Sequence, residues 1–556
     1  MNDNTRDNAA IRFNYVSELY QGGVEKEKQR ILNLLNEDEA HLHQSGDLHI
    51  HDLEGYGKIY NCCAPNLQSW LCSDAYLSHA SPYGKILGIF ESLKRLITML
   101  ATNQTGGIGF SNFDQDIAEV LRVSAIEFGW DTVAFLGECV REFICWINTT
   151  YTRYCREPYY LTLNIGLDTS EWGREISHTL LQEFMNSPSS YSRPNIVFKT
   201  RHEVNGSGAP NYDLFQLALC CTSQRMIPTY LLTDSVVNQI CEPHKLAIMG
   251  CRTRVYDNSN GETGSAGRGN IACVSVNLPR IALKASDLDQ FYLTLNMILK
   301  HAEKLLLERA EAMREQGDSY LHFVIDHHLW NTSDVSEMIM QGTFSIGFIG
   351  ISECVEILTG HKPYESSQSQ ALALQIVRHI RNMADAYRDD TGLNFSVLGS
   401  PGEMLSGRFC GLDRERYPHS VQEKGFYTNS FHVNVDAGVS IYRKIELEAP
   451  FHSICNGGCI TYIELKAAPL DNTLALEDCI EFAVQKGISY LGFNFPYDLC
   501  RQCGFLGTFD NCPSCGSNDI RRLRRVSGYL EELSCFTKGK SAEAKMRKAN
   551  VYIDSE

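Results

Sequence analysis

Four cysteines near the end of this 556-residue chain constrain its fold more than any other feature of the sequence. They form two Cys-x-x-Cys pairs with eight residues between them, and a glycine follows each pair: Cys500, Cys503, Cys512 and Cys515. Each Cys-x-x-Cys turn offers two thiolates to one tetrahedral ion, and the neighbouring glycine frees the backbone to form the turn. Because four thiolates fill every coordination position, we predict a structural zinc site rather than a catalytic one.

A glycine loop follows this cysteine cluster directly, in the run Arg-Arg-Val-Ser-Gly-Tyr-Leu from Arg524 to Leu530. A glycine between serine and tyrosine usually marks a turn, because a residue without Cβ adopts positive φ at little cost. Here a small metal-binding segment would hold the loop that carries Gly528 in a fixed place. The combination of a metal site with this glycine loop favours a functional role for Gly528 over a simple turn.

Length, charge and cysteine content limit the classes of function. A chain of this length exceeds one ordinary domain, although α/β barrels run long as single units. The formal net charge of −17 argues against nucleic acid as the main partner, because phosphate binding requires clustered Lys and Arg. The first residues contain no apolar signal region, and no stretch approaches the ~20 apolar residues that span a bilayer. Twenty-one cysteines in such a chain indicate thiols and metal ligands in a reducing cytoplasm.

Helical and strand-like segments alternate along the chain. Residues 5–39 are typical of a helix, which predicts an N-terminal helical segment over residues 1–45, and Phe291–Gln316 carries an apolar helical face. Short β-rich runs lie between such segments, for example Asn195–Thr200, Ala272–Asn277 and Leu393–Leu398. This alternation predicts an α/β barrel or a doubly wound sheet, and the pattern alone does not choose between them.

Three polar residues, His49, His51 and Asp52, precede the adjacent cysteines Cys62 and Cys63. Alternate residues of a strand face the same way, so these side chains offer metal ligands, but structural hydrogen bonding is the interpretation that we prefer. Adjacent residues point to opposite faces of a strand. One of the two cysteines is therefore expected to face a site, and the other to be buried as a small hydrophobic residue.

A further cysteine lies in a loop context that favours reactivity. Cys251 stands in the run Met-Gly-Cys-Arg, where Arg252 favours the thiolate and Gly250 allows close approach of another group. This local signal is weak by itself.

The run Arg-Val-Ser-Gly-Tyr resembles the radical-bearing loop of glycyl radical enzymes, and the four-cysteine knob resembles that of the anaerobic (class III) ribonucleoside-triphosphate reductases. Further runs match this family in its order, from about Gly46 to Leu530: His-Ile-His-Asp at 49–52, Asn-Cys at 61–62, Met-Gly-Cys-Arg at 249–252, Gly-Arg-Gly-Asn at 267–270 and Asn-Leu-Pro-Arg-Ile-Ala at 277–282. The resemblance implies a ten-stranded α/β barrel of two half-sheets over residues 46–495, with a finger loop near Cys251 through its middle. Residues 496–556 would form the zinc-binding and glycyl radical domain.

The same resemblance implies roles for individual residues. Gly528 would store the radical, because a planar Cα radical is delocalised between the flanking amide N–H and C=O. Cys251 matches the cysteine that becomes a thiyl radical and takes the ribose 3′ hydrogen. Cys62 matches the cysteine that donates a proton as water leaves, and Cys63 is the alternative.

Two loops resemble substrate-binding segments of this family. Ser400 and Glu403 lie in Ser-Pro-Gly-Glu, which resembles a phosphate-side loop, although a surface turn is the other interpretation. Asn456 and Gly457 belong to a second matching run. We assign all four as candidate substrate-binding residues.

The source of reducing equivalents depends on Cys273. Formate-using members of the family lack a cysteine in this strand, whereas members that use a small redoxin carry a second thiol there. If Cys273 faces the pocket, Cys62 and Cys273 would end as a disulfide that a redoxin reduces. The alternatives are that formate supplies the electrons, and that Cys273 is a buried strand residue that serves only to pack the core.

The resemblance also implies partners. A separate radical-SAM enzyme with S-adenosylmethionine and a [4Fe-4S] cluster would generate the radical on Gly528, and the reductase would be a homodimer regulated by nucleotide effectors. Substrates would be ribonucleoside triphosphates, with neither nucleic acid nor membrane as a partner. The chain starts almost at the catalytic part, so we expect no N-terminal ATP-binding regulatory domain. Two other functions stay open: a glycyl radical acyltransferase or lyase resembling formate acetyltransferase, and a zinc-ribbon nucleic-acid binder.

Overall fold

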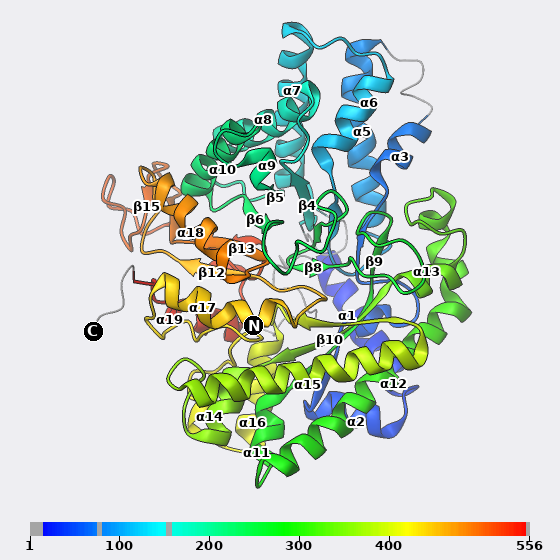
Figure 1. Ribbon diagram of the computed structural model, residues 1–556, viewed down its shortest axis with the longest axis vertical. Coiled ribbons are helices and arrows are strands. Elements are labelled where there is room, and N and C mark those ends of the chain that lie inside the picture. The colour runs from blue at the N-terminus through cyan, green and yellow to red at the C-terminus, as the bar shows by residue number, and fades with distance from the viewer. Residues whose placement is uncertain (1–14, 75–80, 152–157, 552–556) are drawn as a thin grey trace.

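The computed structural model describes residues 15–74, 81–151 and 158–551 and contains one large sheet (Figure 1). Ten strands follow one another through it in the order β11-β10-β9-β2-β3-β4-β5-β6-β13-β12, and β1 (Leu48–Ile50) pairs beside β9. A parallel bridge between Leu398 of β11 and Gly458, just before β12, joins the two ends of this path. The sheet therefore closes on itself, and the predicted ten-stranded barrel is confirmed.

Two half-sheets of parallel strands build the barrel. The first half contains β2 (Cys62–Ala64), β3 (Ile108–Phe110), β4 (Leu161–Ile165), β5 (Asn195–Thr200) and β6 (Thr229–Leu232). The second half contains β9 (Arg268–Asn277), β10 (Thr343–Ile349), β11 (Asn394–Gly399), β12 (Thr461–Glu464) and β13 (Tyr490–Asn494). The halves meet at antiparallel pairs, β2 with β9 and β13 with β6, so they run in opposite directions.

Helices cover the outside of both halves. Figure 1 shows those of the first half in the upper part of the view and several of the second half in the lower part. The first half carries α3 (Leu67–Ser73), α5 (Pro82–Leu100), α6 (Phe113–Val123), α7 (Trp130–Thr149), α8 (Glu171–Asn186), α9 (His202–Asn205) and α10 (Tyr212–Arg225). The second half carries α11 (Leu278–Lys284), α12 (Leu288–Asp326), α13 (Val335–Gln341), α14 (Ile351–Thr359), α15 (Ser367–Thr391), α16 (Leu405–Arg416), α17 (Ile441–His452) and α18 (Thr473–Lys486). Among the described helices, none is both long and apolar enough to cross a membrane.

The N-terminal segment is helical in its described part, with a break that the sequence analysis did not place. Helix α1 (Tyr15–Leu32) ends before α2 (Glu37–Ser45) begins. The Asn36 side chain accepts a hydrogen bond from the Asp38 backbone N–H. Asn36 therefore caps the N-terminus of α2, and the chain begins a second helix here. Residues 1–14 lie outside the described part.

Strand β9 contains an irregularity that decides which of its side chains face the barrel interior. Asn270 pairs with Thr343 of β10, but Ala272 pairs with Phe344, so Ile271 is an extra residue. A bulge of this kind shifts the alternation of side chains by one position. Ile271, Ala272, Val274 and Val276 belong to the main apolar core, whereas Asn270 bonds to Ser345 of β10 and Ser275 bonds to Ser400, directly after β11. Cys273, which alternates with Val274, therefore shares the interior face.

A second, smaller sheet follows the barrel. It contains β14 (Tyr497–Cys500), β15 (Leu506–Gly507), β16 (Ile520–Arg525) and β17 (Leu530–Glu532), in the order β15-β14-β16-β17. Strands β16 and β17 form a hairpin whose tip, residues 526–529, carries Gly528. We call residues 520–532 the Gly528 hairpin. The chain then continues into α19 (Lys538–Met546), which packs on α16 through a close contact of Gly539 with Gly407.

Candidate active site

A finger loop between β6 and β9 enters the barrel. Its short hairpin, β7 (Ile248–Met249) and β8 (Thr253–Arg254), holds Cys251 at the tip after Gly250, which has a φ of +60°. Asn164 of β4 fixes one side, because its amide oxygen accepts from Ile248 N–H at 3.0 Å and its NH₂ donates to Ile248 C=O at 2.9 Å. The chain at the start of β3 lies so close that a Cβ on Gly107, directly before the strand, would collide with Gly250, and a Cβ on Gly109 within it would collide with Met249.

The second half-sheet holds the other side of the finger. Arg254 N–H donates to the Gly457 carbonyl at 3.0 Å, and a Cβ on Gly458 would meet the backbone of Arg252. Backbone therefore lies against backbone on both sides, and this contact fixes Cys251 near the barrel axis. The finger loop implied by the family resemblance is present.

The Gly528 hairpin reaches the same point from the C-terminal sheet. A Cβ built on Gly528 would meet the Cα and the carbonyl oxygen of Cys251 and would lie 2.6 Å from its Cβ. The hairpin tip is closed by Val526 N–H donating to Tyr529 C=O at 3.0 Å, and the Tyr462 hydroxyl donates to Ser527 C=O. Gly528 and Cys251, which are 277 residues apart in sequence, are thus in direct contact.

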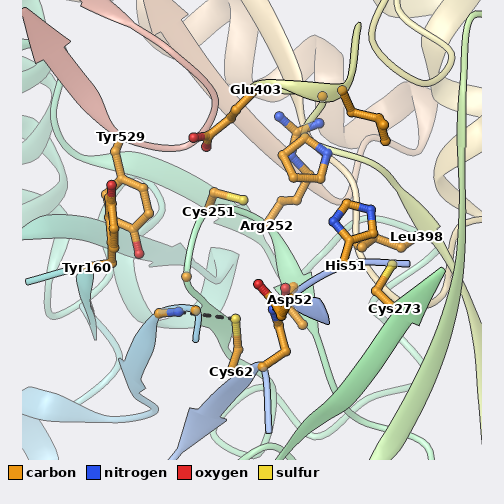
Figure 2. Close-up of a pocket in the computed structure, with 18 of the residues that line it drawn as sticks. His51, Asp52, Cys62, Tyr160, Cys251, Arg252, Cys273, Leu398, Glu403 and Tyr529 are labelled. Atoms are coloured by element: carbon orange, nitrogen blue, oxygen red, sulfur yellow. Dashed lines mark hydrogen bonds between the residues drawn. The ribbon is translucent and has the colours of Figure 1, made fainter. Parts of the chain in front are cut away.

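A pocket opens beside this contact (Figure 2), and three of the cysteines singled out from the sequence line it: Cys62, Cys251 and Cys273. His51, Asp52, Arg252 and Glu403 also lie on its wall. Tyr160 and Tyr529 form another side, with ring centroids 5.0 Å apart. The pocket therefore combines thiols, one cation and two carboxylates around the finger tip.

Of the two adjacent cysteines, Cys62 faces the pocket. The Gly107 N–H donates to its Sγ at 3.2 Å, as the dashed line in Figure 2 shows. Cys63 points the other way, where its thiol donates to Gln104 Oε1 at 3.0 Å within the main core. Burial raises the pKa of the Cys62 thiol well above its usual range, and burial also raises the pKa of Cys251, so both hold their protons at neutral pH.

Cys273 lies on the pocket wall but away from Cys62. Cys62 is opposite Asn270 on β9, and Cys273 is three residues further along that strand. Strand spacing therefore places the Cα atoms of Cys62 and Cys273 roughly 8–10 Å apart, even with the bulge between them. A disulfide spans at most about 7 Å between Cα atoms, so these two thiols cannot join without backbone movement.

His51 and Asp52 are hydrogen-bonding residues on the pocket wall, in agreement with the preferred interpretation. His51 Nε2 lies 2.8 Å from Ser275 Oγ, and the Asn61 NH₂ donates to Asp52 at 2.6 Å. Among the residues that the structure describes, the ligand atoms of His, Cys, Asp and Glu converge on a common point only in the C-terminal cysteine cluster.

The four candidate substrate-binding residues occupy different environments. Glu403 lies on the pocket wall and accepts a hydrogen bond from the Ser527 hydroxyl. Ser400 is buried against Ser275, with 2.7 Å between the hydroxyl oxygens. Asn456 and Gly457 bond to the backbone of Val397 at 3.0 and 2.8 Å, which ties their loop to β11. The structure thus brings Glu403 to the pocket and gives the other three structural hydrogen bonds near it.

The four C-terminal cysteines form one compact cluster. Their sulfur atoms all lie within 4.8 Å of one another, with Cys500–Cys515 at 3.6 Å and Cys503–Cys512 at 3.5 Å. Zn–S bonds of about 2.3 Å in a tetrahedron require sulfurs roughly 3.8 Å apart, so the cluster fits one such ion. Gly504 and Gly516 have φ of +77° and +74° and donate N–H to the carbonyls of Cys500 and Cys512, which closes each turn.

Several pocket residues carried no signal strong enough to identify them from sequence. Arg252 and Tyr529 directly follow Cys251 and Gly528, and this proximity was the available clue. Tyr160 precedes β4 and belongs to no recognisable run. Tyr462 of β12, outside the pocket wall, carried no signal either, and its ring centroid lies 5.9 Å from the guanidinium of Arg252 and 5.8 Å from that of Arg525.

Comparisons with known proteins agree with this geometry. The family model for anaerobic ribonucleoside-triphosphate reductase matches residues 2–549. The enzymes of that name from Salmonella typhimurium and Escherichia coli are 34% and 33% identical, over 93% of this chain and 78% of theirs. The solved anaerobic ribonucleotide reductase from Thermotoga maritima in complex with dATP and CTP has a TM-score of 0.71 at 14% identity, over 95% of this chain and 90% of that one.

These matches support the reductase and not the acyl-transfer alternative. They cover the barrel, the finger loop and the Gly528 hairpin together. The resemblance noted in the sequence is confirmed, and this chain belongs to the anaerobic ribonucleoside-triphosphate reductases, a family of oxidoreductases.

Proposed function

We propose that this chain reduces ribonucleoside triphosphates to 2′-deoxyribonucleoside triphosphates for DNA precursor synthesis, with Gly528 as radical store and Cys251 as the group that attacks substrate. The observation that carries this proposal is the contact between Gly528 and Cys251 at the edge of the pocket. Because the two residues are in van der Waals contact, a hydrogen atom can pass between them directly, without an intervening residue. No other cysteine on the pocket wall is among the atoms nearest to Gly528.

The chemistry requires one hydrogen-atom transfer before substrate reacts. The S–H bond of Cys251 breaks and a Cα–H bond forms on Gly528, which leaves the unpaired electron on sulfur. Cys251 then takes the ribose 3′ hydrogen, which labilises the 2′ hydroxyl. Cys62 donates the proton with which that hydroxyl leaves as water, and its raised pKa keeps the proton in place until then. The 3′ hydrogen finally returns from Cys251 to the product.

Reduction of each ribonucleotide consumes two electrons and two protons, and the family resemblance offers two sources of these electrons. In the first, Cys62 and Cys273 are oxidised to a disulfide that a redoxin reduces, which requires Cys273 to approach Cys62 by backbone movement. In the second, formate is oxidised to carbon dioxide and Cys273 is not oxidised. The separation along β9 favours the second source in the present conformation.

Zinc is the ion that we propose for the cysteine cluster. Its role would be structural, because the four thiolates of Cys500, Cys503, Cys512 and Cys515 occupy every position. The cluster holds β14 beside β16, and β16 leads directly into the tip that carries Gly528. Residues 496–551 would then form one unit whose function is to present Gly528, with residues 46–495 as the catalytic barrel.

Partners follow from this chemistry. A radical-SAM enzyme that holds S-adenosylmethionine and a [4Fe-4S] cluster would remove the hydrogen from Gly528. A homodimer with nucleotide effectors is proposed from the family, in which a relative was solved with dATP and CTP. No disulfide bond joins the cysteines of the described residues, which supports function in a reducing cytoplasm.

The test is formation of deoxynucleotide from CTP under strict anaerobiosis, with the activating enzyme, S-adenosylmethionine and either formate or a redoxin system. Product is expected with at least one reductant. Brief exposure of the activated protein to oxygen should also cut the chain at Gly528, which mass spectrometry detects. A sample that carries the radical but forms no product would refute the reductase, and an activated chain left intact by oxygen would exclude Gly528 as the radical site.

A further inference from the structure

Arg525 occupies an unusual environment for a cation. Its side chain is 2% exposed, and burial lowers its pKa. The described residues give it no carboxylate within ion-pair distance. Its hydrogen-bond partners are three neutral oxygens, those of the Asn494 side chain, the Met226 carbonyl and the Gly528 carbonyl.

A buried charge without a carboxylate partner is costly, and a neutral side chain could hold a loop in place at lower cost. One of these contacts points to what the charge does. Arg525 Nη1 donates to the Gly528 carbonyl at 2.7 Å, within the range of charge-assisted hydrogen bonds, while Nε donates to Asn494 Oδ1 at 2.8 Å. The guanidinium also lies over the Tyr462 ring, 5.8 Å from its centroid, which is within cation–π distance.

The Gly528 carbonyl is one of the two groups over which a Cα radical is delocalised. The flanking nitrogen donates electron density and the carbonyl withdraws it. A cation that bonds to the carbonyl oxygen strengthens the withdrawal and moves spin density from Cα onto the carbonyl. It thereby weakens the Cα–H bond relative to the S–H bond of Cys251.

We propose that Arg525 is a positioning residue that polarises the Gly528 carbonyl, and so sets how strongly the unpaired electron is held on Gly528 rather than on Cys251. This inference rests on the proposed function. The hydrogen bond is present in both the radical and the closed-shell form of Gly528. Only the difference in its strength between the two forms is lost with Arg525, and that loss shifts the equilibrium between the two residues toward sulfur.

The test compares Arg525→Lys and Arg525→Gln with Arg524→Lys as the matched control. Arg524 lies on the same strand but pairs with Asp498 at 2.7 Å, away from Gly528. In electron paramagnetic resonance, the α-hydrogen splitting of the Gly528 radical should increase from wild type to Arg525→Lys to Arg525→Gln, as spin density returns to Cα. The half-life of the radical should be shorter in Arg525→Gln than in wild type, and Arg524→Lys should match wild type in both the splitting and the half-life.

A role of Arg525 in folding alone predicts a different result. Variants that carry the radical would then show the wild-type splitting and half-life at reduced yield, and that outcome overturns the inference while leaving the reductase intact. Absence of the radical from the wild-type protein would instead refute the proposed function.

A second measurement needs no radical. In unactivated protein, infrared spectroscopy with carbon-13 carbonyl-labelled glycine identifies the Gly528 carbonyl as the band that Gly528→Ala removes. Its stretch should move to higher frequency in both Arg525 variants, because the charged hydrogen bond is weakened or lost. An unmoved band in folded variants, as judged by melting temperature and metal content, also overturns the inference.

Discussion

Replacement of Gly528 by alanine tests the contact on which the proposed chemistry depends. The φ angle of Gly528 is outside the left-handed region, so alanine is compatible with the backbone and the effect arises from space alone. The added Cβ would lie 2.6 Å from Cys251 Cβ and would also meet backbone atoms of Cys251, which cannot rotate away. Ordinary contacts begin near 3.5 Å, so the hairpin and the finger must separate by roughly 1 Å.

Overpacking of this kind costs about 1–3 kcal/mol of folding free energy, and a misplacement of about 1 Å costs on the order of 100-fold in rate. We therefore expect Gly528→Ala to unfold at a lower temperature than wild type and to lose at least about 99% of turnover. Gly411→Ala is the matched control, because a Cβ at this helical position in α16 meets nothing within 4 Å. That variant should keep wild-type turnover and gain up to about 1 kcal/mol of stability. Wild-type turnover in Gly528→Ala would refute transfer through this contact.

Three further predictions concern the metal, the thiols and the reductant. Cys500→Ser should lose the bound zinc, measured by elemental analysis, and the radical yield should fall with it, whereas Cys72→Ser, at an exposed cysteine outside the cluster, should keep both. Burial raises the pKa of Cys62 and Cys251, so each thiol keeps its proton as pH rises through the ordinary thiol pKa of about 8.5. Turnover should therefore not decline in this pH range. A fall in turnover with its midpoint near that pH would contradict the assignment of Cys62 as proton donor. Cys273→Ser should retain most formate-supported turnover, given its separation from Cys62, and loss of turnover with every reductant would instead establish Cys273 as a working thiol.

The parts of the site that could be predicted from the sequence are those whose information is local. The cysteine cluster and the Gly528 loop each lie within a few residues of chain, and their spacing alone specified a compact metal site and a presented loop. The parallel strands were predictable as short β-rich runs such as Asn195–Thr200, because β-branched and aromatic residues such as Ile196, Val197 and Phe198 favour strands. The closure of ten strands into a barrel came from family resemblance, since no residue pattern encodes the bridge between Leu398 and Gly458.

What could not be predicted depends on which face of a strand a residue occupies. The choice between Cys62 and Cys63 requires the orientation of β2, which only its pairing with β9 supplies. The position of Cys273 depends on one extra residue, Ile271, because without the bulge Cys273 would face the helices outside the barrel. The hydrogen bond between the hydroxyl groups of Ser400 and Ser275 likewise depends on the packing of distant segments, which no local run of residues specifies.

The site is assembled by backbone approaching backbone, and this explains why glycines and cysteines were its most informative residues. Gly107, directly before β3, and Gly109, within it, leave room for the finger on one side, and Gly458 leaves room for it on the other. Gly528, which belongs to the hairpin of a separate sheet, contacts Cys251 at the tip of the finger. A side chain at any of these positions would hold the finger or the hairpin off by about 1 Å, which is enough to slow a transfer that depends on contact. The charged residues around them, Arg525 above all, can then act on the electronic state of Gly528 without having to set its position alone.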